Sequence, residues 1–250
     1  TGAFGFVGTN LSTYLRARGY DLWALDVAVA AGRASAAPHA YGRVFTWEDF
    51  NTLPTAGVAA VVHLAGKAHD TRHAGDPHAY FTINAGLTGA LVARLTSEPA
   101  TRTIPFVLFS SVKAVADYVD GVLTEAAAPD PRTPYGKSKL EAERIVGGAP
   151  LAGTILRPCM IHGPGNKGNL NLLCKVAGRG LPWPLGAFDN RRSFAAIGNV
   201  CAAVERVLAG AVPPGTYQVA DDDPLSTNEL IAWIAESAGR RARVWRVPPR

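Results

Sequence analysis

The sequence predicts an α/β protein with a doubly wound parallel sheet and a smaller C-terminal lobe, on three observations. Short apolar runs alternate with amphipathic helical segments along residues 1–158. A glycine-rich turn, TGAFGFVG, opens the chain and leads directly into a helical pattern. Beyond residue 158 the pattern changes to Gly-, Pro- and Asn-rich loops. We therefore expect a nucleotide-binding domain over 1–158 and mainly a substrate-binding lobe over 159–250, with some elements returning to the core.

The predicted elements follow one another in a regular order. A helical period over 6–19 ends at Gly19, which suits a C-terminal cap, and a loop follows the next strand up to Gly42. Near the end, Ser226 and Glu229 form a capping box ahead of LIAWIAESAG, which predicts a helix start. The remaining segments are strands over 20–26, 59–65, 104–111 and 153–158, and helices over 78–95 and 135–146.

The glycine turn raises the question of the strand that should precede it. In a doubly wound sheet this turn follows a central strand directly, yet nothing stands before Thr1. We therefore expect the sequence to be a fragment that lacks this strand. A vacant central position would leave ladder groups unpaired, at about 1 to 3 kcal/mol each if buried, so independent folding would be compromised.

The composition narrows the class of protein. The 250 residues are 48% hydrophobic and 18% charged, which is enough apolar material for one large core. No window approaches the roughly 18 apolar residues of a membrane helix and no signal segment leads the chain, so we expect a cytoplasmic protein without a membrane partner. The net charge is +5, and the basic residues are scattered along the sequence except in the run GRRARVWRVPPR. This distribution favours an anionic small molecule over nucleic acid as the ligand.

No metal site or disulfide framework is expected. The three cysteines form no CxxC pair. Pro77 interrupts the helical spacing of the candidate histidines, and no chemistry indicated below requires a metal. These histidines are His69, His73 and His78.

The glycine turn has the features of a dinucleotide site. Gly2, Gly5 and Gly8 open an amphipathic helix whose N-terminal amides and dipole suit a pyrophosphate. Asp26 ends the following strand, and a carboxylate there accepts hydrogen bonds from both ribose hydroxyls and repels a 2′-phosphate. The nearest base, Arg33, lies several residues further on, so NAD is preferred over NADP. An ordinary tight turn with a strand-end carboxylate is the weaker alternative.

A tyrosine, a lysine and a serine form a second constellation. Tyr135 and Lys139 lie four residues apart in TPYGKSK and so share a helix face. Ser110 and Ser111 end the strand IPFVLF, and the carboxyl ends of strands are where such a sheet forms its site. A surface Tyr–Lys pair at this spacing is common. Here, however, the glycine turn, the serine pair and the Tyr–Lys pair are all expected at one crevice, which indicates a catalytic site.

With these motifs the chain resembles the extended short-chain dehydrogenase/reductase family, the NAD-dependent sugar-nucleotide epimerases and dehydratases. The resemblance rests on TGAFGFVG, HLAG, FSSVKAV, YGKSK and RPCMIHGPG, and it extends through NRRSFAAIGNV to the capped helix near the end. It implies a Rossmann fold, bound NAD, a nucleotide-sugar substrate and a homodimer.

The resemblance also implies catalytic roles for Ser111, Tyr135 and Lys139. Tyr135 as a phenolate would take the proton from a sugar hydroxyl while hydride leaves the same carbon for the nicotinamide. Ser111 would bind the reacting oxygen, and Lys139 would bind the nicotinamide ribose. The pKa of a free tyrosine is about 10, so work near neutrality requires it to fall to about 7. Lys139 and the oxidised nicotinamide are the two positive charges that could lower it.

Further contacts are implied by the same resemblance. Arg192 matches an arginine that binds the diphosphate, but Ser193 stands where an Asp is usual and Met160 where an Asn commonly contacts the phosphates, which leaves the substrate class open. Cofactor contacts are expected at Gly2, Gly5, Phe6, Val7, Gly8, Asp26, Leu64, Ala65, Gly66, Asn84, Tyr135, Lys139 and Pro158. Substrate contacts are expected at Ser111, Lys113, Tyr135, Asn169 and Arg192.

The residues after Ser111 decide the expected reaction. Sugar 4,6-dehydratases of this family need an acid–base carboxylate pair directly after the matching serine, whereas Val112 and Lys113 stand here. Dehydration is therefore disfavoured, and 4-epimerisation of a UDP-hexose or UDP-N-acetylhexosamine is the leading expectation. A 4-keto sugar reductase and a non-catalytic NAD-binding regulator are the alternatives.

Overall fold

A computed structural model describes residues 1–27, 40–67, 76–166, 170–188 and 190–247. The chain divides into two compact units. The first unit consists of Thr1–Cys159 and Gly198–Val219, and the second of Met160–Ile197 and Ala220–Arg250.

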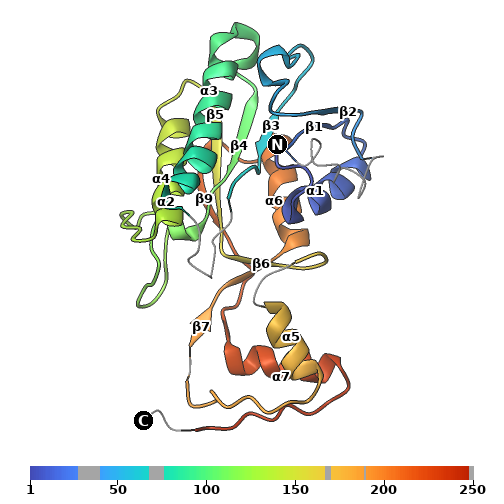
Figure 1. The fold of residues 1–250 in the computed structure, drawn as a ribbon, viewed down its shortest axis with the longest axis vertical. Helices are drawn as coiled ribbons and strands as arrows, with labels where there is room; N and C mark the ends of the chain where they lie inside the picture. Colours follow the sequence, from blue (N-terminus) through green and yellow to red (C-terminus); the bar gives the residue numbers. More distant parts are fainter. Residues whose placement is uncertain (28–39, 68–75, 167–169, 189, 248–250) are drawn as a thin grey trace. The chain divides into compact units, whose positions relative to one another are not determined.

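A parallel sheet of four strands, in the order β3-β4-β5-β9, forms the centre of the first unit (Figure 1). The central strands β4 and β5 are almost entirely buried, as expected of apolar runs covered on both faces. The register sets Phe109 opposite Leu156 and Pro158 opposite Val219, so these strands end close together. The four strands are β3 (Val61–His63), β4 (Pro105–Phe109), β5 (Ala152–Pro158) and β9 (Gly215–Val219).

A separate parallel pair, β1 (Trp23–Leu25) and β2 (Arg43–Phe45), belongs to the same unit. Thr1 and Gly2 join this pair to the larger sheet, since the Gly2 N–H donates to Leu25 O (3.1 Å) and the Thr1 amino group donates to Val62 O (2.7 Å). The glycine turn therefore starts between β1 and β3. Strand β2 was not predicted, because three half-exposed residues carry too short a pattern.

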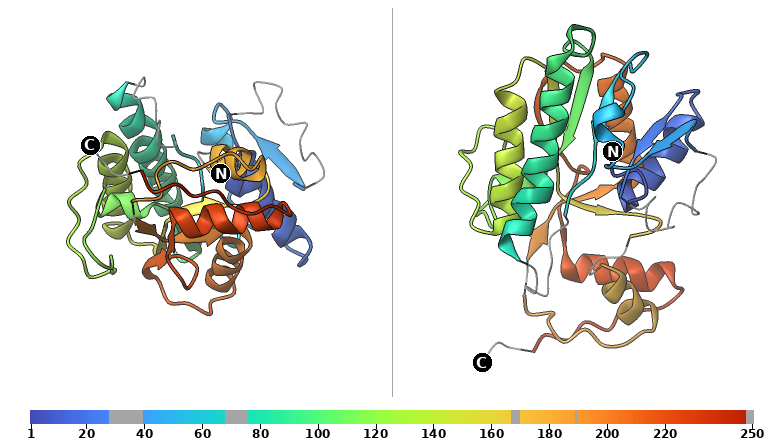
Figure 2. Two further views of the ribbon diagram at one scale, coloured as in Figure 1. Left: turned by 90° about the horizontal axis from the view of Figure 1, so that it is seen from below. Right: turned by 45° about the horizontal axis from the view of Figure 1, so that its top comes forward.

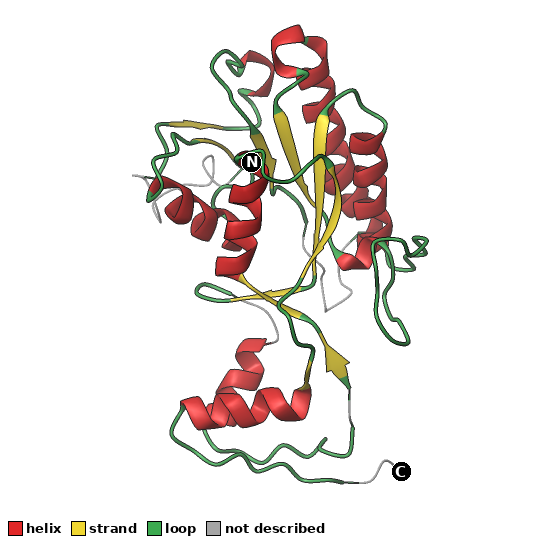
Figure 3. Ribbon diagram, turned by 180° about the vertical axis from the view of Figure 1, so that it is seen from behind, coloured by secondary structure: helices red, strands yellow, loops and turns green. Residues whose placement is uncertain are grey.

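Helices cover both faces of this sheet, which confirms the doubly wound α/β prediction. In the ribbon views α3 and α4 lie on one face, and α1 and α6 on the other (Figures 1, 2 and 3). The expected helix over 78–95 is present, but it contains a π-helical segment, Phe81–Gly86. The helices are α1 (Phe6–Arg16), α2 (Pro77–Tyr80), α3 (Leu87–Ser97), α4 (Pro134–Gly147) and α6 (Ile197–Leu208).

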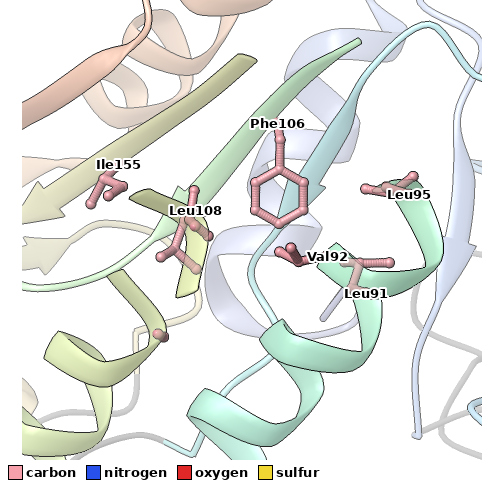
Figure 4. Close-up of a cluster of buried hydrophobic side chains, with 8 residues drawn as sticks. Leu91, Val92, Leu95, Phe106, Leu108 and Ile155 are labelled. Atoms are coloured by element: carbon pink, nitrogen blue, oxygen red, sulfur yellow. The ribbon is translucent and has the colours of Figure 1, made fainter. Parts of the chain in front are cut away.

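The main core lies where α3 and α4 pack on the sheet (Figure 4). Phe106 and Leu108 of β4 are at most 1% exposed. Burying side chains of this size contributes roughly 1.5–3 kcal/mol each, so the core fixes α4 firmly against β4 and β5. Its members are Leu91, Val92, Leu95, Phe106, Leu108, Ala142, Val146 and Ile155.

The second unit contains two short strand pairs and two helices that contact each other. The capping box of Ser226 and Glu229 is formed at the start of α7, which confirms that prediction. No helix within the described ranges is long and apolar enough to cross a membrane. The pairs are β6 (Met160–His162) with β8 (Phe194–Ala196) and β7 (Arg191–Arg192) with β10 (Leu225–Ser226), and the helices are α5 (Leu170–Gly178) and α7 (Thr227–Ser237).

Candidate active site

The glycine turn packs too tightly for side chains at two of its three glycines. Gly2 has a left-handed φ of +67°, and a Cβ there would lie 2.5 Å from the amide nitrogen of Ala65. A Cβ at Gly8 would lie 2.4 Å from the carbonyl oxygen of Gly2. Among the described residues, a Cβ at Gly5 would approach only that same oxygen, at 3.3 Å. Gly2 and Gly8 therefore allow the close packing of α1, the turn and the end of β3, whereas Gly5 leaves space beside the turn.

The N-terminus of α1 can accept an anion at this space. Gly5 is the N-cap, and no side chain in the described parts of the chain caps the helix. The first turn of an α-helix leaves its amides without intrahelical partners, and these amides carry the positive end of the helix dipole. Phe6, Val7 and Gly8 contribute such amides, so they fit a pyrophosphate.

Asp26 lies directly beside the glycine turn. Its carboxylate oxygen Oδ2 accepts a hydrogen bond from the Phe4 N–H at 2.9 Å, and the residue is buried. Tyr41 lies against the same turn, because its hydroxyl donates to Ala3 O (3.0 Å) and its ring meets that of Phe4 edge-on at 5.6 Å. Sequence reasoning missed Tyr41, which lies within the stretch expected to be a loop up to Gly42. Arg33 lies outside the described residues.

The segment after β3 brings three predicted residues together. The Leu64 N–H donates to Thr1 O, and the Ala65 N–H to Thr1 Oγ1, each at 3.2 Å. A Cβ added to Gly66 would lie 2.9 Å from Asn84 Oδ1 and 3.1 Å from Lys139 Nζ. The main chain at Gly66 therefore lies directly against both of these polar groups.

Asn84 connects this segment to α4. It is 2% exposed and lies in the π-helical segment. Its Oδ1 accepts from the Lys67 N–H at 2.7 Å, and its Nδ2 donates to Ser138 Oγ at 2.9 Å. Asn84 thus holds the end of β3 beside the helix that carries Tyr135.

Lys67 and Tyr80 adjoin the tyrosine, although sequence reasoning did not single them out. The Lys67 ammonium lies 5.2 Å from the centre of the Tyr80 ring. The Tyr80 ring meets the Tyr135 ring edge-on, with centres 6.1 Å apart. A lysine directly after the strand-end glycine was the available sequence signal.

Tyr135 is held beside Ser111 by the start of α4. Thr133 caps the helix by accepting the Gly136 N–H at 3.2 Å. A Cβ at Gly136 would lie 2.3 Å from Lys113 O, so glycine permits α4 to approach the segment after β4. Burial raises the pKa of Tyr135, and its side-chain hydrogen bond with Ser111 acts in the opposite direction. The described protein groups alone therefore hold this pKa above its usual value, and the fall expected with bound NAD stays a prediction.

Lys139 points into the protein at the end of β4. Its Nζ donates to Phe109 O at 2.8 Å, and the residue is 7% exposed. Burial lowers the pKa of Lys139 to about 8, and the charge of Glu143 opposes this effect. The ammonium is still charged near neutral pH, so a positive charge stands one helical turn from Tyr135.

Lys113 forms an ion pair within its own loop. Its Nζ lies 3.1 Å from the Asp117 carboxylate. The same carboxylate accepts the N–H groups of Arg132 (2.9 Å) and Thr133 (3.2 Å), which lie at the start of α4. A substrate contact of Lys113 stays a prediction. Pro158 is the buried last residue of β5.

The remaining substrate predictions fall on the second unit. Arg192 is exposed on β7, and its neighbour Arg191 pairs with Glu229 at 3.3 Å. Met160, at the start of β6, is 39% exposed. Asn169 lies outside the described residues, as do His69 and His73 of the rejected metal site. No group of three metal-ligating side chains occurs in the described parts of the chain.

Known proteins are similar to this chain over most of its length. The model of the NAD dependent epimerase/dehydratase family matches residues 1–220. UDP-glucose 4-epimerase from Vibrio cholerae is 27% identical over 263 residues, covering 99% of this chain and 77% of that protein. GDP-6-deoxy-D-mannose reductase from Pseudomonas aeruginosa is 28% identical over 264 residues, covering 100% of this chain and 83% of that protein.

Solved structures show the same likeness. A putative epimerase from Burkholderia cenocepacia J2315 superposes with a TM-score of 0.81 at 28% identity, covering 97% of this chain and 81% of that one. MoeE5 in complex with UDP-glucuronic acid and NAD superposes with a TM-score of 0.75 at 26% identity, covering 97% of this chain and 83% of that one.

Proposed function

Because the chain belongs to the NAD-dependent epimerase/dehydratase family, we propose that it is a nucleotide-sugar 4-epimerase that keeps NAD bound through its cycle. The single observation that carries the proposal is the grouping of Ser111, Tyr135 and Lys139 at the end of β4. Tyr135 and Lys139 are the proton-transfer and charge-bearing groups that oxidation of a sugar hydroxyl needs. A non-catalytic NAD-binding regulator has no use for this pair.

The residues of the first unit fit NAD. The amides at the start of α1 would hold the pyrophosphate, and Asp26 the adenosine ribose. Lys139 would bind the nicotinamide ribose. The main chain at Gly66 lies against Lys139 Nζ, so there is no room for a side chain at this position. The other strand-end contacts would be Leu64, Ala65, Asn84 and Pro158.

The chain's own residues move a proton and hold an oxygen. When bound, NAD supplies a hydride acceptor and donor at its nicotinamide ring. Tyr135 as a phenolate takes the proton from the C4 hydroxyl, while Ser111 donates a hydrogen bond to the same oxygen. After the 4-keto sugar has rotated so that its other face is presented, Tyr135 returns that proton to the oxygen as hydrogen is restored at C4. The Lys139 ammonium stabilises the phenolate form.

The segment after Ser111 argues against dehydration. Val112–Ala114 forms a single 3₁₀ turn, and Lys113 pairs with Asp117. The two positions that carry an acid–base carboxylate pair in the family's dehydratases are thus an apolar and a basic residue here. The reactions left are 4-epimerisation and reduction of a 4-keto sugar, and whole-chain similarity to the Pseudomonas reductase supports reduction as the second candidate.

For the substrate we propose a UDP-hexose or a UDP-N-acetylhexosamine. The relatives include a UDP-glucose 4-epimerase and a protein solved with UDP-glucuronic acid. Arg192 of the second unit would bind the diphosphate, since a guanidinium can form two parallel hydrogen bonds with phosphate oxygens. Assembly as a homodimer in the cytoplasm is part of the same proposal.

Incubating the purified protein with NAD and UDP-N-acetylglucosamine tests the proposal. An epimerase converts the sugar into its C4 isomer without net consumption of NADH, and chromatography of the nucleotide sugars measures this. A reductase leaves that substrate unchanged and oxidises NADH only when given a 4-keto nucleotide sugar. If neither reaction occurs with any UDP-hexose or UDP-N-acetylhexosamine, the proposed substrate class is wrong.

A further inference from the structure

A buried ionic cluster lies behind the proposed catalytic residues and has no part in the mechanism above. Glu143 of α4 is 5% exposed, and Arg157 of β5 is 7% exposed. Arg157 donates twice to the Glu143 carboxylate, from Nε to Oε1 (2.9 Å) and from Nη2 to Oε2 (2.6 Å). The Ser110 hydroxyl donates to Oε1 as well. The cluster therefore joins α4, β5 and the end of β4.

Each member of the cluster adjoins a residue of the site. Glu143 lies one helical turn after Lys139 on α4, so both project from the same side of the helix. Ser110 directly precedes Ser111, and its N–H donates to Leu156 O at 2.8 Å. Arg157 directly precedes Pro158. A displacement of the cluster would therefore move Ser111 and Lys139 relative to each other.

Stability alone is a poor explanation for the cluster. Taking a carboxylate and a guanidinium out of water is costly, and well-packed apolar residues in place of such pairs are often as stable or more stable. A network with fixed geometry is, by contrast, well suited to hold neighbouring groups in register. The position beside Lys139 and Ser111 indicates that the network serves the site.

The charge of Glu143 acts on Lys139. Burial lowers the pKa of Lys139, and Glu143 is the charged group that raises it. Among the described residues, His63 of β3 also interacts with Lys139 from a packed element, and its pKa lies well below its usual value because of burial, the terminal amino group and Lys139. It is thus neutral wherever Lys139 titrates. Glu125, which accepts the Gln218 N–H at 2.9 Å, also interacts with the charge of Arg157, which lowers the pKa of Glu125.

We propose that Glu143 is a positioning residue for the Ser111, Tyr135 and Lys139 site. With Arg157 and Ser110 it locks α4 against the ends of β4 and β5, and its negative charge keeps the Lys139 ammonium charged at the place where the phenolate forms. The catalytic role of Glu143 rests on the proposed function, whereas its role in fixing α4 against β4 and β5 does not.

Titration of Lys139 in the whole protein tests the electrostatic part without any substrate. Isotope-labelled lysine gives one NMR signal per side chain, and Lys139→Met identifies the signal of Lys139. In Glu143→Gln, loss of the carboxylate charge should lower the titration midpoint of this signal by about one pH unit. A shift of this size is typical of removing a nearby opposite charge. Glu141→Gln is the matched control, because Glu141 lies on the same helix and pairs only with the exposed Arg144 among the described residues.

A double variant keeps the test valid if Glu143→Gln does not fold. Glu143→Gln leaves Arg157 buried without its partner, whereas Glu143→Met combined with Arg157→Met removes both charges and keeps the volume. The midpoint should fall in this double variant too, because the charge of Glu143, which raises the pKa of Lys139, is lost in it as well. A midpoint equal to that of the wild type in the folded double variant overturns the proposal.

Steady-state kinetics tests the catalytic part. In Glu143→Gln, kcat should fall at least tenfold with little change in KM, and its alkaline limb should move toward acid together with the lysine midpoint. Glu143→Asp restores the charge and should recover part of kcat. A variant that is less stable but has wild-type kcat and pH profile contradicts the proposal. Absence of turnover in the wild type would count against the proposed function alone and leave the titration result standing.

Discussion

The glycine turn and the start of α4 both lie at strand ends of the first unit, but they are built in opposite ways. At the turn, function depends on glycine having no side chain, because a Cβ at Gly2 or Gly8 would lie within 2.5 Å of the main chain. At α4 it depends on side chains that are present and fixed, since Lys139 bonds to Phe109 O and Tyr135 to Ser111. Substitutions should therefore fail differently in the two regions, by steric conflict in one and by loss of a chemical group in the other.

The largest effect is expected at Tyr135. Tyr135→Phe removes the proton acceptor and leaves the ring, so turnover should fall about 1,000-fold, within the range of general acid–base catalysis, while NAD affinity stays within about twofold. Assays of turnover and of NAD binding by fluorescence check this. Tyr118→Phe is the control, since the Tyr118 hydroxyl is exposed and bonds only to Asp120 among the described residues. Retention of most activity in Tyr135→Phe would remove the tyrosine from the mechanism.

The last and the middle glycine of the turn, Gly8 and Gly5, should separate packing from binding. Gly8→Ala forces a Cβ against Gly2 O and should cost about 1–3 kcal/mol of the free energy of unfolding. Gly5→Ala meets less crowding and should keep this free energy within about 0.5 kcal/mol, yet weaken NAD at least tenfold by filling the space beside the helix N-terminus. Chemical denaturation and calorimetric titration with NAD measure the two quantities. Equal losses of stability in both variants would contradict the assignment of the space at Gly5.

The smallest effect is expected at Asp26. Asp26→Asn removes the charge but keeps an acceptor for the Phe4 N–H, so it should reduce the preference for NAD over NADP about tenfold without loss of stability. Asp26→Ala should relax the preference equally and also lower the melting temperature, because the Phe4 N–H loses its acceptor. The ratio of kcat/KM for the two cofactors is the measurement. An unchanged ratio in both variants would show that Asp26 does not face the ribose.

Local patterns predicted those elements whose cause is local. The helix over 6–19, the capped helix at Ser226 and the alternation of strands and helices follow from periodicity, caps and apolar runs, and the structure contains all of them. The spacing of Tyr135 and Lys139 likewise predicted a shared helix face. Strand β2 and the π-helical segment were missed, because three half-exposed residues and a one-residue widening of a helix carry no sequence period.

Interactions between distant segments could not be predicted. The pairing of Glu143 with Arg157 depends on the packing of α4 against β5, and the contact of Gly66 with both Asn84 and Lys139 depends on three separate elements. The burial that raises the pKa of Tyr135 could not be predicted for the same reason, since it is a property of the assembled site. A glutamate four residues after Lys139 was the one signal in the sequence that pointed to the buried cluster.

The ion pair of Lys113 and Asp117 constrains how this scaffold can change its chemistry over time. Asp117 accepts the N–H groups that precede α4, so it helps to set the place where Tyr135 emerges. An acidic residue at position 113, one step toward dehydratase chemistry, would set two negative charges against each other there. The order of substitutions would then matter, because Asp117 has to be replaced first. This requirement makes the evolution of an elimination reaction on this scaffold less accessible.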